Sequence, residues 1–142
     1  MSNNDIGIDL GTSNIVITMG NKGVVLSEPS VIAYNTRTER VLAVGKEAYE
    51  MIGRNPDYIC VSRPVSDGVI SDDDLAKSMI REFIIKISGH QLLKPRIIIC
   101  VPAFVTDIES RAIVDAAKFA GARQVYLIQE PVAAMIGAEV DI

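Results

Sequence analysis

The segment from residue 96 to residue 129 constrains the fold more than any other part of the sequence. Arg96–Val101 is an almost wholly apolar run, and Gln124–Gln129 is a second strand-like run. Between them, Thr106–Ala120 has the apolar spacing of a helix and is followed by Gly121. A strand, a helix and a strand of these lengths predict a right-handed crossover between two parallel, buried strands. The segment therefore predicts an α/β domain.

The first 27 residues predict three further strands. Short runs at Asp5–Leu10, Asn14–Gly20 and Gly23–Ser27 are separated by turns that contain glycine and asparagine. This spacing is typical of a β-meander. A meander joined to a parallel crossover predicts a mixed five-stranded sheet covered by helices.

A small inserted lobe is expected between these two parts, over residues 33–67. It contains the strand-like run Val41–Val44 and a short amphipathic helix, Lys46–Ile52, which Gly53 ends. The lobe has few apolar residues with which to build a core of its own. Residues 1–32 and 68–142 then form the main body.

A long helix is expected after the lobe. Ser71 precedes three consecutive aspartates, and apolar residues recur at helical spacing from there to Gly89. The Ser71 hydroxyl is expected to cap the first amides, and the acids complement the positive end of the helix dipole.

Composition excludes several classes of function. The chain has 142 residues, a net charge of −4, and basic residues that are scattered rather than clustered. Nucleic acid is therefore not an expected partner. No apolar stretch reaches the roughly 18 residues that span a bilayer, and the first residues are too polar for a signal peptide, so a cytoplasmic protein is expected. Cys60 and Cys100 lie in strand-like runs and are expected to be inert packing residues.

The strongest local signal for chemistry is the run from Asp9 to Asn14. Asp9 lies near the end of an apolar strand, and a turn follows that begins with Gly11 and continues with Thr12 and Ser13. Backbone amides in such a turn can converge on phosphate oxygens, and a carboxylate beside them can hold the water shell of Mg²⁺. An ordinary β-hairpin with an acid at the strand end explains the same residues.

Two more carboxylates follow apolar strands. Thr106 and Glu109 match the S/T-x-x-E capping box, and spacing alone favours this structural role for Glu109 over the orientation of a water against a phosphoryl group. Glu130 follows the last strand directly. Because ligands bind at the carboxyl edge of open α/β sheets, Asp9, Glu109 and Glu130 together favour a metal–nucleotide site.

Four motifs together resemble the MreB family of bacterial actin homologues. They are Gly7-Ile8-Asp9-Leu10-Gly11-Thr12-Ser13-Asn14, Leu26-Ser27-Glu28-Pro29-Ser30-Val31, Arg63-Pro64-Val65-Ser66-Asp67-Gly68-Val69-Ile70 and Gln129-Glu130-Pro131-Val132-Ala133-Ala134. The resemblance runs from about residue 5 to residue 142. It implies the actin-like, ribonuclease H-like ATPase fold shared with DnaK-type chaperones and sugar kinases.

The resemblance also implies roles for individual residues. Gly11, Thr12, Ser13 and Asn14 would form the first phosphate loop for ATP. Asp9 and Glu130 would bind Mg²⁺ through water, and Glu109 would polarise the attacking water.

At the level of the whole protein, the resemblance implies one lobe of a filament-forming cytoskeletal ATPase. Such a protein determines cell shape by organising cell-wall synthesis at the membrane, and its partners would be its own copies, the inner face of the membrane and the cell-wall elongation machinery. The second lobe of the family is absent from these 142 residues, so the chain alone is expected to be inactive. A lobe of a sugar-kinase-like phosphotransferase or of a DnaK-type chaperone is the alternative.

A membrane contact is expected in the loop after the long helix. Leu92 and Leu93 are adjacent at the tip of this loop, and the basic residues Lys94 and Arg96 follow them. Basic residues near an anionic leaflet gain roughly 1 kcal/mol each. The alternative is that the two leucines fold back over the end of the helix.

Overall fold

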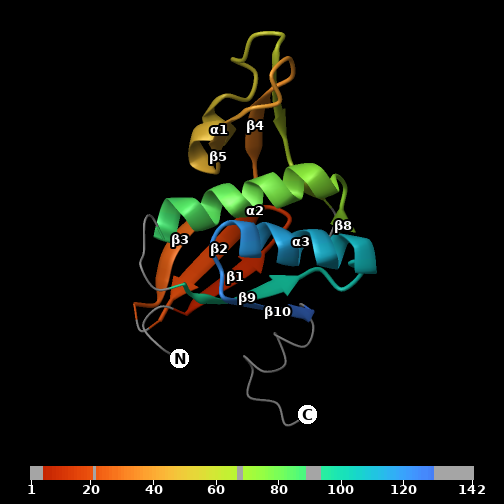
Figure 1. The fold of residues 1–142 in the computed structure, drawn as a ribbon. Helices are drawn as coiled ribbons and strands as arrows, with labels where there is room; N and C mark the ends of the chain where they lie inside the picture. The colour runs from red at the N-terminus through yellow and green to blue at the C-terminus, as the bar shows by residue number, and fades with distance from the viewer. Residues whose placement is uncertain (1–4, 21, 67–68, 89–93, 130–142) are drawn as a thin grey trace.

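The computed structural model describes residues 5–20, 22–66, 69–88 and 94–129 (Figure 1). The main sheet contains β1 (Ile6–Leu10), β2 (Asn14–Met19), β3 (Val24–Pro29), β9 (Arg96–Val101) and β10 (Gln124–Gln129). The other strands are β4 (Ile32–Asn35), β5 (Val41–Val44), β6 (Ile59–Ser62), β7 (Val65–Ser66) and β8 (Val69–Ile70). The helices in the described residues are α1 (Lys46–Glu50), α2 (Asp73–Ser88) and α3 (Asp107–Phe119).

The main sheet has the strand order β10-β9-β1-β2-β3. β1, β2 and β3 are antiparallel neighbours, whereas β9 is parallel to both β1 and β10. The predicted mixed five-stranded sheet and its parallel crossover are therefore confirmed. Because β1, β9 and β10 run in the same direction, their carboxyl ends meet at one edge of the sheet.

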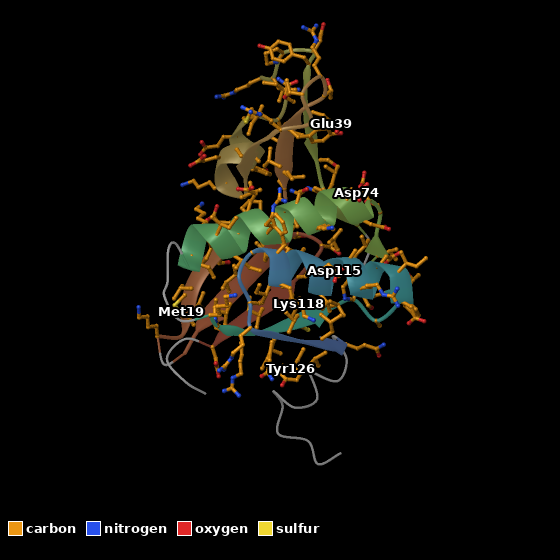
Figure 2. The ribbon with its side chains drawn as sticks, in the orientation of Figure 1. Met19, Glu39, Asp74, Asp115, Lys118 and Tyr126 are labelled. Carbon is orange, nitrogen blue, oxygen red and sulfur yellow. The ribbon has the colours of Figure 1, made fainter. Side chains whose placement is uncertain are left out.

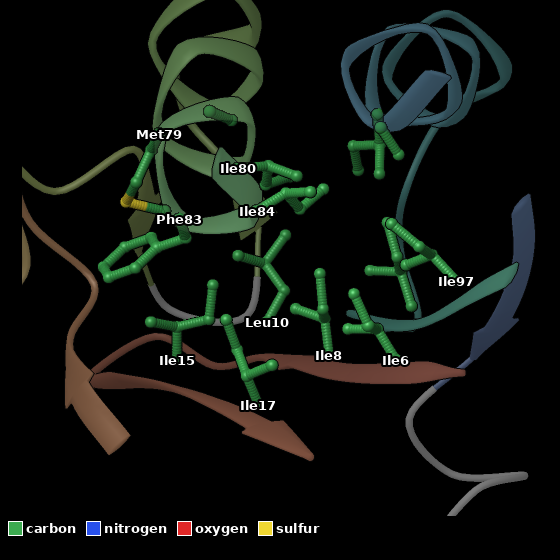
Figure 3. Packing of buried hydrophobic residues seen from close by; sticks show 14 of the residues in the cluster. Ile6, Ile8, Leu10, Ile15, Ile17, Met79, Ile80, Phe83, Ile84 and Ile97 are labelled. Carbon is green, nitrogen blue, oxygen red and sulfur yellow. The ribbon is translucent and has the colours of Figure 1, made fainter. Parts of the chain in front are cut away.

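The core lies between the main sheet and the two long helices. Alternate residues of β1 and β2 point toward α2, where Met79, Ile80, Phe83 and Ile84 cover them (Figure 3). These four positions recur at helical spacing, so they form one apolar stripe. The side chains that meet the stripe are also buried: Ile6, Ile8, Leu10, Ile15 and Ile17. Each such side chain contributes roughly 1.5–3 kcal/mol by leaving water.

The opposite face of the main sheet has no helix against it within the described residues (Figure 1). Asp9 on this face is exposed, and Ile98 and Cys100 are only partly buried. Tyr126 of β10 points away from α3 and is 51% exposed (Figure 2). The expectation of fully buried crossover strands is therefore wrong for the described part of the chain, because helices cover one face only. Cys100 is half-buried for the same reason. Cys60 in the small lobe is also half-buried, and neither cysteine is in a disulfide.

The start of α2 differs from the prediction. The Asp72 carboxylate accepts a hydrogen bond from the Leu75 amide at 3.0 Å and therefore caps the helix. The Ser71 hydroxyl donates instead to the Pro64 carbonyl at 3.1 Å, and the Ser71 amide donates to the same oxygen at 2.8 Å. The prediction that Ser71 is the cap is wrong, because the Pro64 carbonyl, between β6 and β7, holds Ser71 outside the helix.

A three-stranded sheet, in the order β5-β4-β6, and α1 form a small lobe beyond α2 (Figure 1). Val31, Ala33 and Ala48 form its small core. The helix is shorter than predicted and ends at Glu50. β6 contains Cys60, whose strand-like run was expected without defined bounds, and all four of its residues are half-buried.

Glu28, near the end of β3, fastens the small lobe to the main body. Its carboxylate accepts a hydrogen bond from the Lys46 amide at 2.9 Å and an ion-pair contact from Lys86 of α2 at 3.0 Å. Gly45 lies against this carboxylate with a φ of +68°, and a Cβ there would collide with the Glu28 oxygen. The close approach therefore requires glycine at this position.

Candidate functional site

The turn between β1 and β2 lies at the carboxyl edge of the sheet and begins with Gly11. The Gly11 amide donates to the Asn14 carbonyl at 3.1 Å, which closes the turn. A Cβ on Gly11 would lie 2.6 Å from that same oxygen. Only glycine fits, because the atom in the way belongs to the backbone and cannot rotate aside.

Ser30 fixes the orientation of two peptide groups in this turn. Its hydroxyl donates to the Gly11 carbonyl at 2.7 Å, and its amide donates to the Ser13 carbonyl at 3.0 Å. In a trans peptide the carbonyl of one residue and the amide of the next point in opposite directions. Ser30, which is fully buried, thus turns the amides of Thr12 and Asn14 away from itself. Amides gathered on one side of a turn form a site for an anion such as phosphate.

Asp9 is the one exposed residue in the otherwise buried or half-buried β1. It lies on the face away from the core and pairs in register with Cys100, which in turn pairs with Ile128. Glu130 follows β10 but lies outside the described residues. Within the described part of the chain, no group of three or more potential metal ligands comes together. Of the two predicted Mg²⁺ ligands, Asp9 and Glu130, only Asp9 lies among the described residues.

Glu109 lies in the first turn of α3, the helix that follows β9. The Thr106 hydroxyl accepts a hydrogen bond from the Glu109 amide at 3.2 Å, so Thr106 is the cap that the spacing predicts. The Glu109 carboxylate carries a buried oxygen, Oε2, that has no hydrogen-bond partner among the described residues. A buried acceptor without a partner is costly, and such an atom can accept a hydrogen bond from a bound water or ligand.

The predicted membrane loop is described only in part. Leu92 and Leu93 lie outside the described residues. Arg96 donates to the buried Asp5 carboxylate through Nε at 3.1 Å and Nη2 at 2.6 Å, and the hydrogen bond to Asp5 raises the pKa of Arg96. Arg96 therefore pairs with a residue beside the main sheet, and its side chain remains 41% exposed. Lys94 is exposed.

Sequence reasoning missed two residues that contact the turn. Ser30 holds the Gly11 and Ser13 carbonyls, and the Arg63 guanidinium donates to the Ser13 carbonyl at 3.3 Å. Both belong to motifs that were recognised, Glu28-Pro29-Ser30 and Arg63-Pro64. The signal available in the sequence is a polar residue at each end of the inserted lobe, where the chain leaves and re-enters the main body.

These residues fit a nucleotide with its Mg²⁺ ion. The turn leaves no room for a side chain at Gly11, and two of its carbonyls are held by Ser30, so the amides that follow them point away from Ser30. Backbone amides of such a turn can bind a phosphate. The buried Glu109 oxygen has an unmet need for a donor, and Asp9 offers the carboxylate chemistry that Mg²⁺ prefers.

A mixed five-stranded sheet, a glycine turn after its first strand and a small inserted sheet define an actin-like α/β domain. The model of the MreB/Mbl protein family matches residues 3–142. The chain belongs to the MreB/Mbl family.

Individual relatives agree with this assignment. The cell shape-determining protein Mbl of Bacillus subtilis (strain 168) is 48% identical over 139 residues, which are 97% of this chain and 42% of Mbl. The cell shape-determining protein MreB of Escherichia coli (strain K12) is 44% identical over 144 residues, with the same coverage of 97% and 42%. The crystal structure of MreB5 of Spiroplasma citri bound to ADP has a TM-score of 0.78 at 33% identity, covering 96% of this chain and 41% of MreB5. The chain thus spans less than half the length of each of these relatives.

Proposed function

We propose that this chain is the N-terminal lobe of an ATP-binding, filament-forming, actin-like cytoskeletal protein that determines bacterial cell shape. The proposal rests first on the phosphate-loop geometry. Ser30 holds the Gly11 and Ser13 carbonyls, so the Thr12 and Asn14 amides point away from it, and only glycine fits at position 11 of this turn. Solved structures of Spiroplasma citri MreB5 contain ADP and AMPPNP, which supports ATP as the ligand.

In this proposal the first phosphate loop, Gly11 to Asn14, binds the phosphates through backbone amides and the side chains of Thr12, Ser13 and Asn14. Asp9 and Glu130 hold Mg²⁺ through its water shell. The ion supplies neutralisation of the phosphate charge. The run from Ile15 to Asn21 contains no lysine or arginine, so backbone amides and the ion carry this task.

Glu109 is proposed to polarise the attacking water. Its buried Oε2 is an acceptor that the described residues leave unsatisfied, and a water bound there would lie beside a carboxylate at the carboxyl edge of the sheet. The complete protein is expected to be a slow ATPase. The chain spans less than half the length of its curated relatives, and by itself it is expected to be inactive.

The assembled protein is proposed to organise cell-wall synthesis from the inner face of the cytoplasmic membrane. Curated relatives carry the name cell shape-determining protein, which supports this role. The small lobe, residues 33–67, is proposed to contact the next subunit of a filament. None of the described helices is long and apolar enough to span a membrane. Leu92 and Leu93 are proposed to make a peripheral contact.

Calorimetry of ATP binding in the presence and absence of Mg²⁺ tests the nucleotide site. In the full-length protein, Asp9→Ala should weaken Mg²⁺-dependent binding by about tenfold or more, because one lost charged interaction is worth about 1.4 kcal/mol or more. Asp57→Ala removes an exposed acid from the small lobe and should leave the affinity unchanged. The isolated 142-residue chain should bind weakly or undetectably. Submicromolar binding by the isolated chain, or equal affinities of the two variants, would contradict the proposal.

A further inference from the structure

The chain passes between the main body and the small lobe twice, and both passages contact the first phosphate loop. The outgoing passage, from β3 to β4, contains Ser30, whose amide donates to the Ser13 carbonyl at 3.0 Å. The returning passage, from β6 to β7, contains Arg63, whose Nη1 donates to the same carbonyl at 3.3 Å. One carbonyl oxygen of the loop therefore contacts both connections to the small lobe.

The Arg63 side chain contacts both the first phosphate loop and α1, while hydrogen bonds to the next residue hold the backbone. The neighbouring Pro64 carbonyl accepts hydrogen bonds from the Ser71 amide at 2.8 Å and from the Ser71 hydroxyl at 3.1 Å. This ties the returning passage to the segment just before α2. The guanidinium lies 5.9 Å from the centre of the Tyr49 ring, on α1 of the small lobe. Such a contact is a cation–π interaction.

We propose that Arg63 is a positioning residue that couples the orientation of the small lobe to the first phosphate loop. The inference rests on the proposed ATP site and assigns to it a mode of regulation. Arg63 links Tyr49, a lobe residue, to the Ser13 carbonyl, so a lobe that turns relative to the main body moves the charge that holds this carbonyl.

The charge on Arg63 also acts on the amide of the same peptide group. The Ser13 carbonyl and the Asn14 amide belong to one planar unit, and a cation at the oxygen draws electron density away from the N–H. The Asn14 amide becomes a better donor to an anion while its direction is held. Loss of Arg63 therefore weakens phosphate binding without removing any group that touches the phosphate.

The coupling is reciprocal by thermodynamic necessity. If the lobe orientation that keeps Arg63 on Ser13 favours nucleotide, then bound nucleotide favours that lobe orientation by the same factor. Binding of nucleotide at the loop would thus change the orientation of the small lobe, including α1.

Hydrogen exchange and calorimetry on the full-length protein test the inference, with Arg63→Gln as the variant. The matched control is Arg37→Gln, because Arg37 also lies over a tyrosine ring of the small lobe, Tyr58, at 5.2 Å. Without nucleotide, Arg63→Gln should speed amide exchange in residues 11–14 about three- to tenfold, since one charge-assisted hydrogen bond is lost from an exposed site. In Arg37→Gln, the amide exchange rates of residues 11–14 should equal those of the wild type.

The second arm adds ATP and Mg²⁺. In the wild type and in Arg37→Gln, nucleotide should slow exchange in α1, whereas in Arg63→Gln this response should disappear and the Kd for ATP should rise about three- to tenfold. Thermal unfolding should be the same for both variants, because both arginines are exposed. Unchanged loop exchange, or an α1 response that persists in Arg63→Gln, would overturn the inference. If the wild type binds no ATP, the proposed function fails, and the nucleotide-free arm alone decides whether Arg63 positions the loop.

Discussion

Glu109 lies in the capped first turn of α3, and its carboxylate has a buried oxygen without a hydrogen-bond donor among the described residues. Its amide is satisfied by the Thr106 hydroxyl, while the buried Oε2 of its carboxylate has no partner among the described residues. A capping box would pair the carboxylate with the amide of the cap. Of the two hydrogen bonds of a capping box, the structure shows the one from the Glu109 amide to the Thr106 hydroxyl. The carboxylate is therefore available for a different role, and the two roles make opposite predictions.

Replacing Glu109 with alanine distinguishes catalysis from capping. In the full-length protein, Glu109→Ala should slow ATP hydrolysis by about a hundredfold, because water-orienting carboxylates act mainly on the transition state. ATP affinity should change little. The free energy of unfolding should stay constant or rise by about 1 kcal/mol, since a buried oxygen without a partner is removed.

Thr106→Ala provides the contrast within the same turn of α3. It should lower the free energy of unfolding by about 1 kcal/mol through loss of the cap, with turnover unchanged. Steady-state phosphate release and urea denaturation measure the two effects. If Glu109→Ala kept full turnover and melted at a lower temperature, the capping role alone would explain this residue.

At the scale of the elements, α2 ties the molecule together. One side of the helix covers β1 and β2, and Lys86 near its end pairs with Glu28 at the base of the small lobe. Its start is fixed by Asp72, while Ser71 in front of it is bonded to the returning passage. The helix also packs against β5, so it contacts the main sheet and the three-stranded sheet of the small lobe.

Two adjacent isoleucines of α2 test how much this packing contributes. Ile84 is 1% exposed, whereas Ile85 is 45% exposed. Ile84→Ala should destabilise the fold by about 2–5 kcal/mol, because burial is lost and a cavity remains. Ile85→Ala makes the same chemical change outside the core and should cost less than about 1 kcal/mol. Urea denaturation followed by circular dichroism should separate the two, and equal losses would show that α2 does not pack on the sheet in this register.

At the scale of the whole molecule, two surfaces are proposed to meet partners: the face of the main sheet that no described helix covers and the loop that contains Leu92 and Leu93. Half of the main sheet's surface has no helix over it in the described residues, and the relatives are more than twice as long as this chain. In the proposed membrane contact, the charge of Arg96 is paired with Asp5, while its side chain remains 41% exposed. Lys94 is exposed and is the basic residue beside the two leucines that takes part in none of the described ion pairs.

Liposome co-sedimentation of full-length polymer tests the membrane contact. The double variant Leu92→Ser, Leu93→Ser should lose most of its pelleting with anionic vesicles, because the polymer multiplies a weak apolar contact in each subunit. Asp5→Asn serves as a control, since it frees Arg96 without touching the leucines. Equal pelleting of wild type and double variant, under conditions where polymer alone stays in solution, would show that the loop does not dock.

Much of the fold follows from local patterns. The parallel pair β9 and β10, the meander and the Thr106 cap were all predicted, because each depends on residues close together in the chain. Strand periodicity, the length of the crossover and a hydroxyl three residues before an amide are local properties. The Gly11 turn was also identified locally, as a candidate phosphate loop with a hairpin as its alternative.

The sequence by itself determined these elements and which acids follow them. Tertiary structure decided the rest: that Asp72 rather than Ser71 caps α2, that Arg96 pairs with Asp5, and that Ser30 and Arg63 hold the loop carbonyls. The last two contacts join residues 19 and 50 positions apart in the chain. No local pattern encodes such contacts, because they exist only after the small lobe has folded out of the main body and its two connections lie beside the turn.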